Sequence, residues 1–175
     1  ATANLLLVRS VTKVNRELLD TSAVQFVASA TIGTDHVDLD YLQERGIGFA
    51  HAPGCNADAV VQYDLSVFCR LMPHWRELNV GIVGCGNVGG RLYRILKALG
   101  VACQIYDPFL DADSNPDLVG YGDVLKANIV CFHTPLTRHG RYPTEHLLGR
   151  QQLADLLPGT LLLNAGRGAV IDNRA

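Results

Sequence analysis

Residues 84–89 read GCGNVG, which is the spacing G-x-G-x-x-G. An apolar run over residues 80–83 leads into the motif, and a helix-like stretch with one apolar stripe follows it. In that context the first glycine permits a tight turn, the second lets the backbone approach a pyrophosphate, and the third lets helix pack on strand. The helix N-terminus adds N–H groups and partial positive charge. The motif predicts a dinucleotide site, with a chance glycine-rich turn as the alternative. Its residues are Gly84, Gly86, Asn87, Val88 and Gly89.

A carboxylate stands roughly twenty residues beyond this motif, at the end of the next expected strand. Asp107 could accept hydrogen bonds from both ribose hydroxyls of an adenosine, and it would repel a 2′-phosphate. No arginine follows it directly, so this position favours NAD over NADP. The alternative is a turn or helix-cap role, because Asp107-Pro108 is a common turn sequence.

Arg167 lies between two glycines just beyond an apolar run. The carboxyl ends of parallel strands are where open sheets bind ligands. A guanidinium there can grip a substrate carboxylate and stabilise negative charge that develops on a neighbouring oxygen. A surface arginine at a strand end is the alternative interpretation.

The elements that must position these residues alternate between short apolar strands and helices. Continuously apolar strands in strand–helix–strand order predict parallel sheets that are covered on both faces, an α/β fold. The helix after the glycine motif is expected to bury Val88, Leu92, Ile95 and Leu99. Other helices are expected over 38–45, 56–72 and 151–157, and strands over 5–8, 25–29, 47–50, 80–83, 101–106, 129–132 and 160–163.

The strand–helix pattern restarts near residue 77, which predicts two domains. Residues 1–76 would form a substrate domain and residues 77–175 a dinucleotide-binding Rossmann domain, with 73–77 as the linker. Both domains look incomplete relative to a full doubly wound fold.

Composition excludes several classes of protein. A net charge of −2 leaves no electrostatic footprint for nucleic acid or for an anionic membrane. No apolar run approaches the roughly 20 residues that span a bilayer. The odd number of cysteines, without a C-x-x-C pair, favours reduced thiols in the cytoplasm. No metal site is predicted, because helix-start chemistry explains the Asp35-His36-Val37-Asp38 cluster better.

Six segments, in this order along the chain, resemble the D-isomer-specific 2-hydroxyacid dehydrogenase family. They are residues 8–15 (VRSVTKVN), 30–38 (ATIGTDHVD), 52–57 (APGCNA), 81–89 (GIVGCGNVG), 132–136 (FHTPL) and 164–173 (NAGRGAVIDN).

The resemblance implies oxidation of a phosphorylated 2-hydroxy acid, with NAD taking the hydride, by a cytoplasmic homodimer of two Rossmann-like domains. It makes Arg167 the catalytic arginine, Ser10 and Thr31 substrate-binding residues, and Thr134 a residue along the cofactor. Turn chemistry is the alternative for Ser10, Thr31 and Thr134. Arg9 and Lys13 could add positive charge for a phosphate. The alternatives are another family member, such as a phosphoglycerate dehydrogenase, a non-catalytic NAD-sensing corepressor-like module, and an unrelated nucleotide domain.

Some residues depart from the family pattern. The family's base is a histidine well downstream of the arginine, assisted by a glutamate, so both are expected beyond Ala175, where this chain stops. His133 does not match that base and is expected to pack beside the cofactor loop. His139 belongs to no constellation of chemical groups. Asp64 is unusual because it lies on an otherwise apolar helix.

Overall fold

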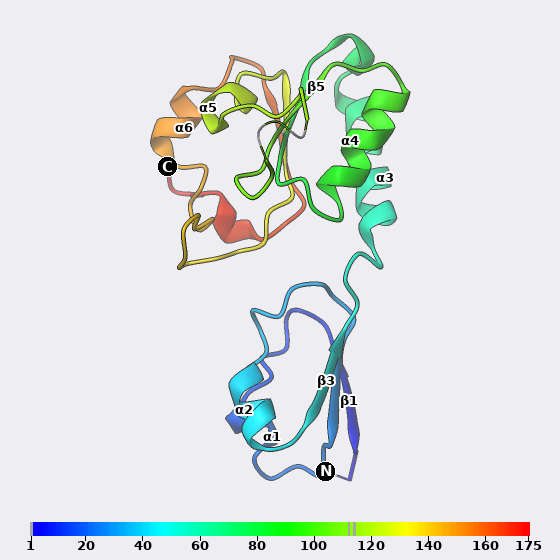
Figure 1. Ribbon diagram of the computed structural model, residues 1–175, viewed down its shortest axis with the longest axis vertical. Coiled ribbons are helices and arrows are strands. Elements are labelled where there is room, and N and C mark those ends of the chain that lie inside the picture. The colour runs from blue at the N-terminus through cyan, green and yellow to red at the C-terminus, as the bar shows by residue number, and fades with distance from the viewer. Residues whose placement is uncertain (1, 112, 114) are drawn as a thin grey trace. The chain divides into compact units, whose positions relative to one another are not determined.

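The computed structural model describes residues 2–111, 113 and 115–175 (Figure 1). The chain divides into two compact units, with the division between Asn56 and Ala57. The sequence pattern placed this boundary near residue 77. It falls earlier because helix α3 (Ala57–Leu71) buries Val61 and Phe68 in the core of the second unit. Periodicity in the sequence shows which face of a helix is apolar, but only the fold shows which core that face packs against.

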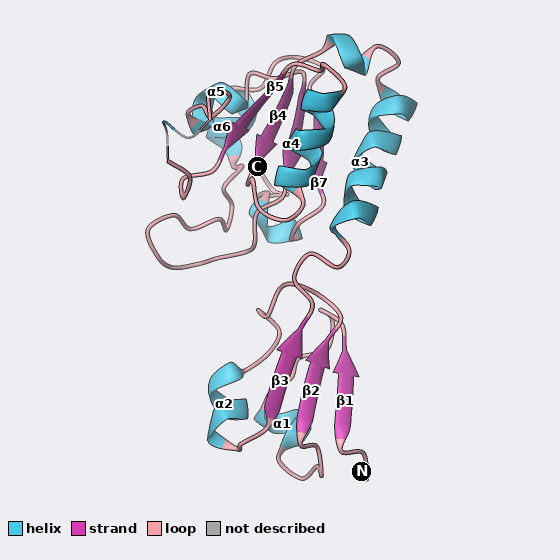
Figure 2. Cartoon of the chain, turned by 45° about the vertical axis from the view of Figure 1, so that its right-hand side comes forward, coloured by secondary structure: helices cyan, strands magenta, loops and turns pink. Residues whose placement is uncertain are grey.

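The first unit is a parallel sheet of order β1-β2-β3 with two short helices on one face (Figure 2). Its core contains Val8, Val27 and Leu42, while Leu5 and Leu7 lie exposed on the opposite face. In chain order its elements are β1 (Leu5–Val8), α1 (Arg16–Leu19), β2 (Phe26–Ser29), α2 (Leu39–Glu44) and β3 (Gly48–His51).

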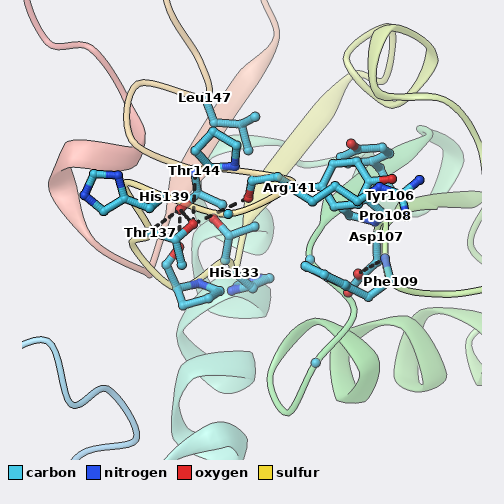
Figure 3. A pocket seen from close by; sticks show the side chains of 17 residues that line it. Tyr106, Asp107, Pro108, Phe109, His133, Thr137, His139, Arg141, Thr144 and Leu147 are labelled. Atoms are coloured by element: carbon cyan, nitrogen blue, oxygen red, sulfur yellow. Dashed lines mark hydrogen bonds between the residues drawn. The ribbon is translucent and has the colours of Figure 1, made fainter. Parts of the chain in front are cut away.

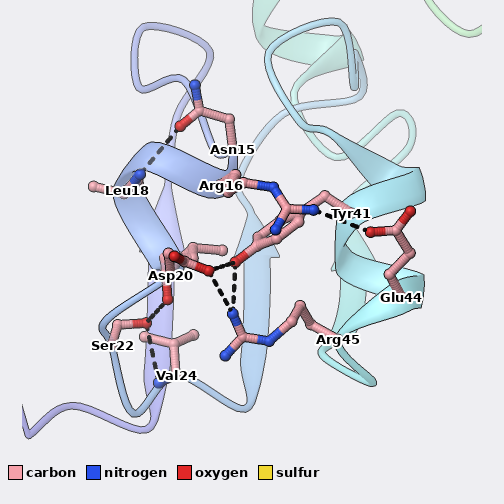
Figure 4. Close-up of polar contacts among 10 residues, drawn as sticks. Asn15, Arg16, Leu18, Asp20, Ser22, Val24, Tyr41, Glu44 and Arg45 are labelled. Carbon is pink, nitrogen blue, oxygen red and sulfur yellow. Dashed lines mark hydrogen bonds and ion pairs between the residues drawn. The ribbon is translucent and has the colours of Figure 1, made fainter.

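Polar contacts connect the two helices of this unit (Figure 4). The Arg45 guanidinium donates to the Tyr41 hydroxyl at 2.8 Å and to the Asp20 carboxylate at 3.1 Å. Asp38 caps α2 by accepting a hydrogen bond from the Tyr41 N–H at 3.0 Å. That contact is the helix-start role expected for Asp38.

The second unit contains a parallel sheet of order β5-β4-β6-β7. Helices α3 and α4 pack side by side on one face, and α5 packs against β4 and β5 (Figures 1 and 2). After α3 its elements are η1 (Trp75–Glu77), β4 (Val80–Val83), α4 (Gly89–Ala98), β5 (Cys103–Tyr106), α5 (Tyr121–Val124), β6 (Ile129–Phe132), α6 (Arg150–Ala154), β7 (Leu161–Asn164) and η3 (Gly168–Val170).

Strands β4 and β6 are buried along their whole length. Ile82 lies in the core beneath α3 and α4, and Val83 lies in a second core on the other face. Covered faces of this kind require apolar residues at every strand position. The predicted parallel α/β fold is therefore confirmed.

Two details of the predicted helices differ from the structure. Helix α4 buries Leu92 and Leu96, whereas the predicted Ile95 and Leu99 are 37% and 48% exposed. The helix begins at Gly89, and the buried side of the helix contains Gly89, Leu92 and Leu96. Ile95 and Leu99 lie further round the helix and are therefore partly exposed. Helices α1 and α5 were not predicted, because a single turn is too short to show a periodic pattern.

Within the described residues, no helix combines the length and the apolar character that a membrane crossing needs.

Candidate dinucleotide site

The candidate site lies at the carboxyl end of β4, where the order of the strands in the second sheet changes side. Strands β5 and β6 flank β4 on opposite sides, so the connections leave the carboxyl end of β4 in two directions. Ligands of open α/β sheets bind in the crevice at such a point. The predicted residues Gly84, Asp107 and Thr134 follow these strands.

The three glycines of the motif have different environments. Gly84 adopts φ +90°, in the left-handed region that favours glycine, and its N–H donates to the Tyr106 carbonyl at 2.8 Å. A Cβ on Gly89 would overlap the Gly84 carbonyl oxygen. A Cβ on Gly86 would meet no atom within 4 Å. The first and third glycines thus serve the local packing, while the second borders open space.

Helix α4 begins directly behind this turn. Val88 is its N-cap residue and offers no side-chain acceptor, and Asn87 before it is exposed. Within the first turn, the Gly90 N–H donates to the Gly86 carbonyl at 2.9 Å and the Arg91 N–H donates to the Val88 carbonyl at 3.0 Å. The amides that precede Gly90, at the start of the helix, are the ones that can bind an anionic oxygen.

A cavity of about 380 Å³ opens beside the turn (Figure 3). Its walls are Gly84 and Gly86, Tyr106 at the end of β5 with residues 107–109 after it, residues 133–135 after β6, and residues of the loop 137–147. The Phe109 and Tyr142 rings meet edge to face within this wall, with centroids 5.4 Å apart. Cavities of this size are typical of sites that bind small molecules or cofactors.

Asp107 reaches from β5 to the glycine turn. Its carboxylate accepts hydrogen bonds from the Cys85 N–H at 2.9 Å and from the Phe109 N–H at 3.1 Å. The turn role considered as an alternative is therefore present. Each carboxylate oxygen retains a second lone pair, so ribose hydroxyls could still donate to both. Burial raises the pKa of the Cys85 thiol, and the nearby Asp107 charge raises that pKa further.

The segment after β6 lies against the glycine turn. The His133 N–H donates to the Val83 carbonyl at 2.8 Å, and a Cβ on Gly84 would lie 3.0 Å from the Thr134 methyl carbon. The position of His133 beside the loop is the one expected from the sequence. The Thr134 hydroxyl oxygen is buried and finds no hydrogen-bond partner among the described residues. A buried hydroxyl of this kind requires a ligand or a water molecule.

Arg167 follows β7, the strand that pairs with β6. It precedes η3, and its carbonyl accepts a hydrogen bond from the Asn164 side-chain amide at 3.0 Å. A Cβ on Gly166 would lie only 2.8 Å from the Thr134 carbonyl oxygen. The structure thus brings the arginine segment next to Thr134, although Arg167 is not among the residues that line the cavity.

Ser10 and Thr31 lie in the first unit, beyond the carboxyl ends of two paired strands, because Val8 of β1 pairs with Ser29 of β2. The Thr31 hydroxyl lies 2.9 Å from the Ser29 hydroxyl, and Ser10 is half-buried. Both predicted substrate residues therefore lie beyond the carboxyl ends of neighbouring strands of the first sheet.

The cavity wall formed by residues 137–147 was not predicted. His139, Arg141 and Tyr142 line it, although no motif marks them. Pro143 is a local signal that could have indicated an irregular segment there. Irregular loops acquire their position from the strands they connect, which local sequence does not encode.

Residues 68–175 match the description "D-isomer specific 2-hydroxyacid dehydrogenase, NAD binding domain". The chain belongs to this family. The expected family resemblance is thereby confirmed, and the glycine turn, Asp107 and Thr134 all fall within the matched NAD-binding domain.

Curated members of the family that are similar to this chain carry the name erythronate-4-phosphate dehydrogenase. The protein of Teredinibacter turnerae is 55% identical over 175 residues, which are 100% of this chain and 47% of that protein. The protein of Cellvibrio japonicus is 53% identical over 99% of this chain and 46% of its own length. The chain therefore spans about half the length of the curated relatives that it matches.

Solved structures of the family have the same fold. The NAD⁺-bound 3-phosphoglycerate dehydrogenase of Entamoeba histolytica matches with a TM-score of 0.84 and 23% identity, over 98% of this chain and 58% of its own. The D-lactate dehydrogenase of Aquifex aeolicus, with NAD and lactic acid, matches with a TM-score of 0.74 and 23% identity, over 97% and 58%. These two likenesses establish the fold alone.

Proposed function

We propose that the second unit binds NAD in the cavity beside the glycine turn. The binding residues are Gly84, Gly86, Asn87, Val88, Gly89, Asp107 and Thr134. Two observations support the fit. Gly86 borders open space that a pyrophosphate could enter, and the buried Thr134 hydroxyl lacks a partner among the described residues. Asp107 is placed to accept the ribose hydroxyls, and its charge favours NAD over NADP.

We further propose that the protein oxidises 4-phospho-D-erythronate to 2-oxo-3-hydroxy-4-phosphobutanoate, on the route to pyridoxal 5′-phosphate. The observation that carries this substrate is the 55% identity to the Teredinibacter protein, because it extends over the whole of this chain. When bound, NAD supplies the hydride acceptor. The Arg167 guanidinium would bind the substrate carboxylate and its C2 oxygen, and stabilise negative charge on that oxygen. Ser10 and Thr31 would bind substrate oxygens from the first unit.

The test is a chimera in which these 175 residues replace the matching 47% of the Teredinibacter protein. We expect it to reduce NAD, followed by absorbance at 340 nm, with 4-phospho-D-erythronate as the substrate. Turnover with 3-phosphoglycerate alone would transfer the chain to another dehydrogenase of the family. NADH binding without turnover of either acid would favour the NAD-sensing module.

Arg167 is tested in the same chimera. Arg167→Ala should lower kcat/KM by about 10²- to 10³-fold, as expected for removal of one group that stabilises a developing oxyanion. Arg174→Ala is the matched control, because Arg174 is exposed and lies seven residues further on. A chimera that keeps full activity without the Arg167 side chain would remove this residue from the mechanism.

We also propose that the protein acts in the cytoplasm as a homodimer, as the family resemblance implies. Light scattering of the chimera, coupled to gel filtration, should give twice the mass of its chain. Fractionation of the source cells should place the protein with the cytoplasmic enzymes.

A further inference from the structure

A buried acid and a buried histidine meet behind the dinucleotide site. Asp64 is on α3 and His133 directly follows β6, and their side chains are 0% and 1% exposed. The Asp64 Oδ2 atom lies 3.2 Å from the His133 Nε2 atom. The two side chains therefore lie within ion-pair distance in the interior of the second unit.

Packing does not explain the acid. Val61 and Phe68, one turn to either side on α3, are buried in the apolar core, and an apolar residue at position 64 would continue their face. Burial raises the pKa of the Cys131 thiol, and the charge of Asp64 raises that pKa further. Among the described residues, neither carboxylate oxygen accepts a hydrogen bond of good geometry. Burying a carboxylate with so few partners is energetically unfavourable.

His133, the partner of Asp64, forms part of the wall of the cavity. The His133 backbone carbon and oxygen would lie 3.1 and 3.2 Å from a Cβ on Gly84. His133 lines the cavity (Figure 3), and so does the adjoining Thr134. The buried His133 side chain is therefore attached to the backbone that packs against Gly84 and continues into Thr134.

We propose that Asp64 is a positioning residue for the dinucleotide site and acts through His133. Its carboxylate holds the imidazole in one place, and this in turn fixes the backbone of residues 133–134 against the glycine turn. The inference rests on the proposed binding of NAD, because it assigns Asp64 a role in that same site. Supporting groups of this kind act by keeping the contacting groups in their binding geometry.

The test measures NADH affinity and stability separately on the 175-residue chain. Asp64→Asn should weaken NADH binding about tenfold in the folded protein, a size typical of two coupled buried groups. Val61→Ala is the matched control, because Val61 lies on the same helix and is 2% exposed. It should lower the free energy of unfolding and leave the NADH dissociation constant unchanged. His133→Gln combined with Asp64→Asn should weaken binding by less than the product of the two separate effects.

The outcomes separate this inference from the proposed function. A wild-type chain that does not bind NADH would overturn both. A wild-type chain that binds NADH, with equal affinity in Asp64→Asn, would overturn the positioning role alone. Should the variants not fold, ¹⁵N NMR of labelled histidines in the wild-type chain still decides. Saturation with NADH must shift the His133 ring nitrogens, and unchanged His133 resonances would refute the inference.

Discussion

Replacing Gly86 by alanine should weaken cofactor binding without weakening the fold. A Cβ at this position would meet no atom within 4 Å, so the added methyl group has space in the protein alone. The backbone there is not in the left-handed region, because positive φ values in the motif are confined to Gly84. The free energy of unfolding should therefore stay within about 1 kcal/mol of wild type. The same methyl group would project into the space that a pyrophosphate must enter.

The expected loss of affinity follows from the contact that the methyl group blocks. A hydrogen bond from a backbone N–H to a charged oxygen contributes about 1.5–3 kcal/mol. Its loss raises the dissociation constant of NADH by about 10- to 150-fold. Isothermal titration calorimetry gives this constant, and urea unfolding followed by the fluorescence of the buried Trp75 gives the stability.

Two other glycines provide the comparison. Gly89→Ala should cost at least about 1–3 kcal/mol of stability, because its Cβ would overlap the Gly84 carbonyl oxygen. Gly122→Ala is the neutral control, because Gly122 also borders open space but does not line the cavity. Wild-type NADH affinity in Gly86→Ala would refute the proposed approach of the pyrophosphate. A large loss of stability in that variant would refute the packing argument.

Three further predictions concern charged groups of the second unit. Asp107→Ser should weaken NADH binding about tenfold and improve NADPH binding, because an acceptor and a negative charge are removed; calorimetry with both cofactors measures this. Asp107→Asn should speed alkylation of Cys85 by iodoacetamide at pH 8, because it removes a charge that raises the thiol pKa; peptide mass mapping measures the rate. Lys97 and Tyr93 each donate to Asp117 at 2.7 Å and lower its pKa. Asp117 should therefore contribute about 1 kcal/mol of stability above its unfolded pKa of about 3.9, a contribution lost as pH falls through the lower folded value. Urea unfolding of Asp117→Asn should show a deficit at pH 7 that shrinks below about pH 4.

Two of these predictions have an internal reference. Alkylation of the exposed Cys69 reports any general change in accessibility and should proceed equally in both proteins. Lys126→Met is the reference for Asp117, because Lys126 forms an exposed pair with Asp123 and should affect stability little. Unchanged cofactor preference in Asp107→Ser, or a stability deficit in Asp117→Asn that is independent of pH, would contradict the corresponding argument.

The features of this protein that depend on residues adjacent in the chain were predictable from the sequence. The strands at 80–83 and 129–132 have the bounds of β4 and β6, because full burial on two faces demands an apolar residue at every position. The glycine motif was likewise recognisable, because a turn and a close helix contact restrict residues that are adjacent in the chain. The positions of Asp107 and Arg167 at strand ends followed from the same local pattern.

Only the tertiary structure showed which segments that are distant in the sequence contact one another. The helix α3 looked like the end of the first domain, but its buried face belongs to the second unit. Asp64 was only an unusual acid in the sequence until the fold placed its carboxylate 3.2 Å from the His133 imidazole. The loop 137–147 became a wall of the cavity for the same reason. Such contacts depend on how the elements pack in space, and the burial that makes them energetically important exists only after folding.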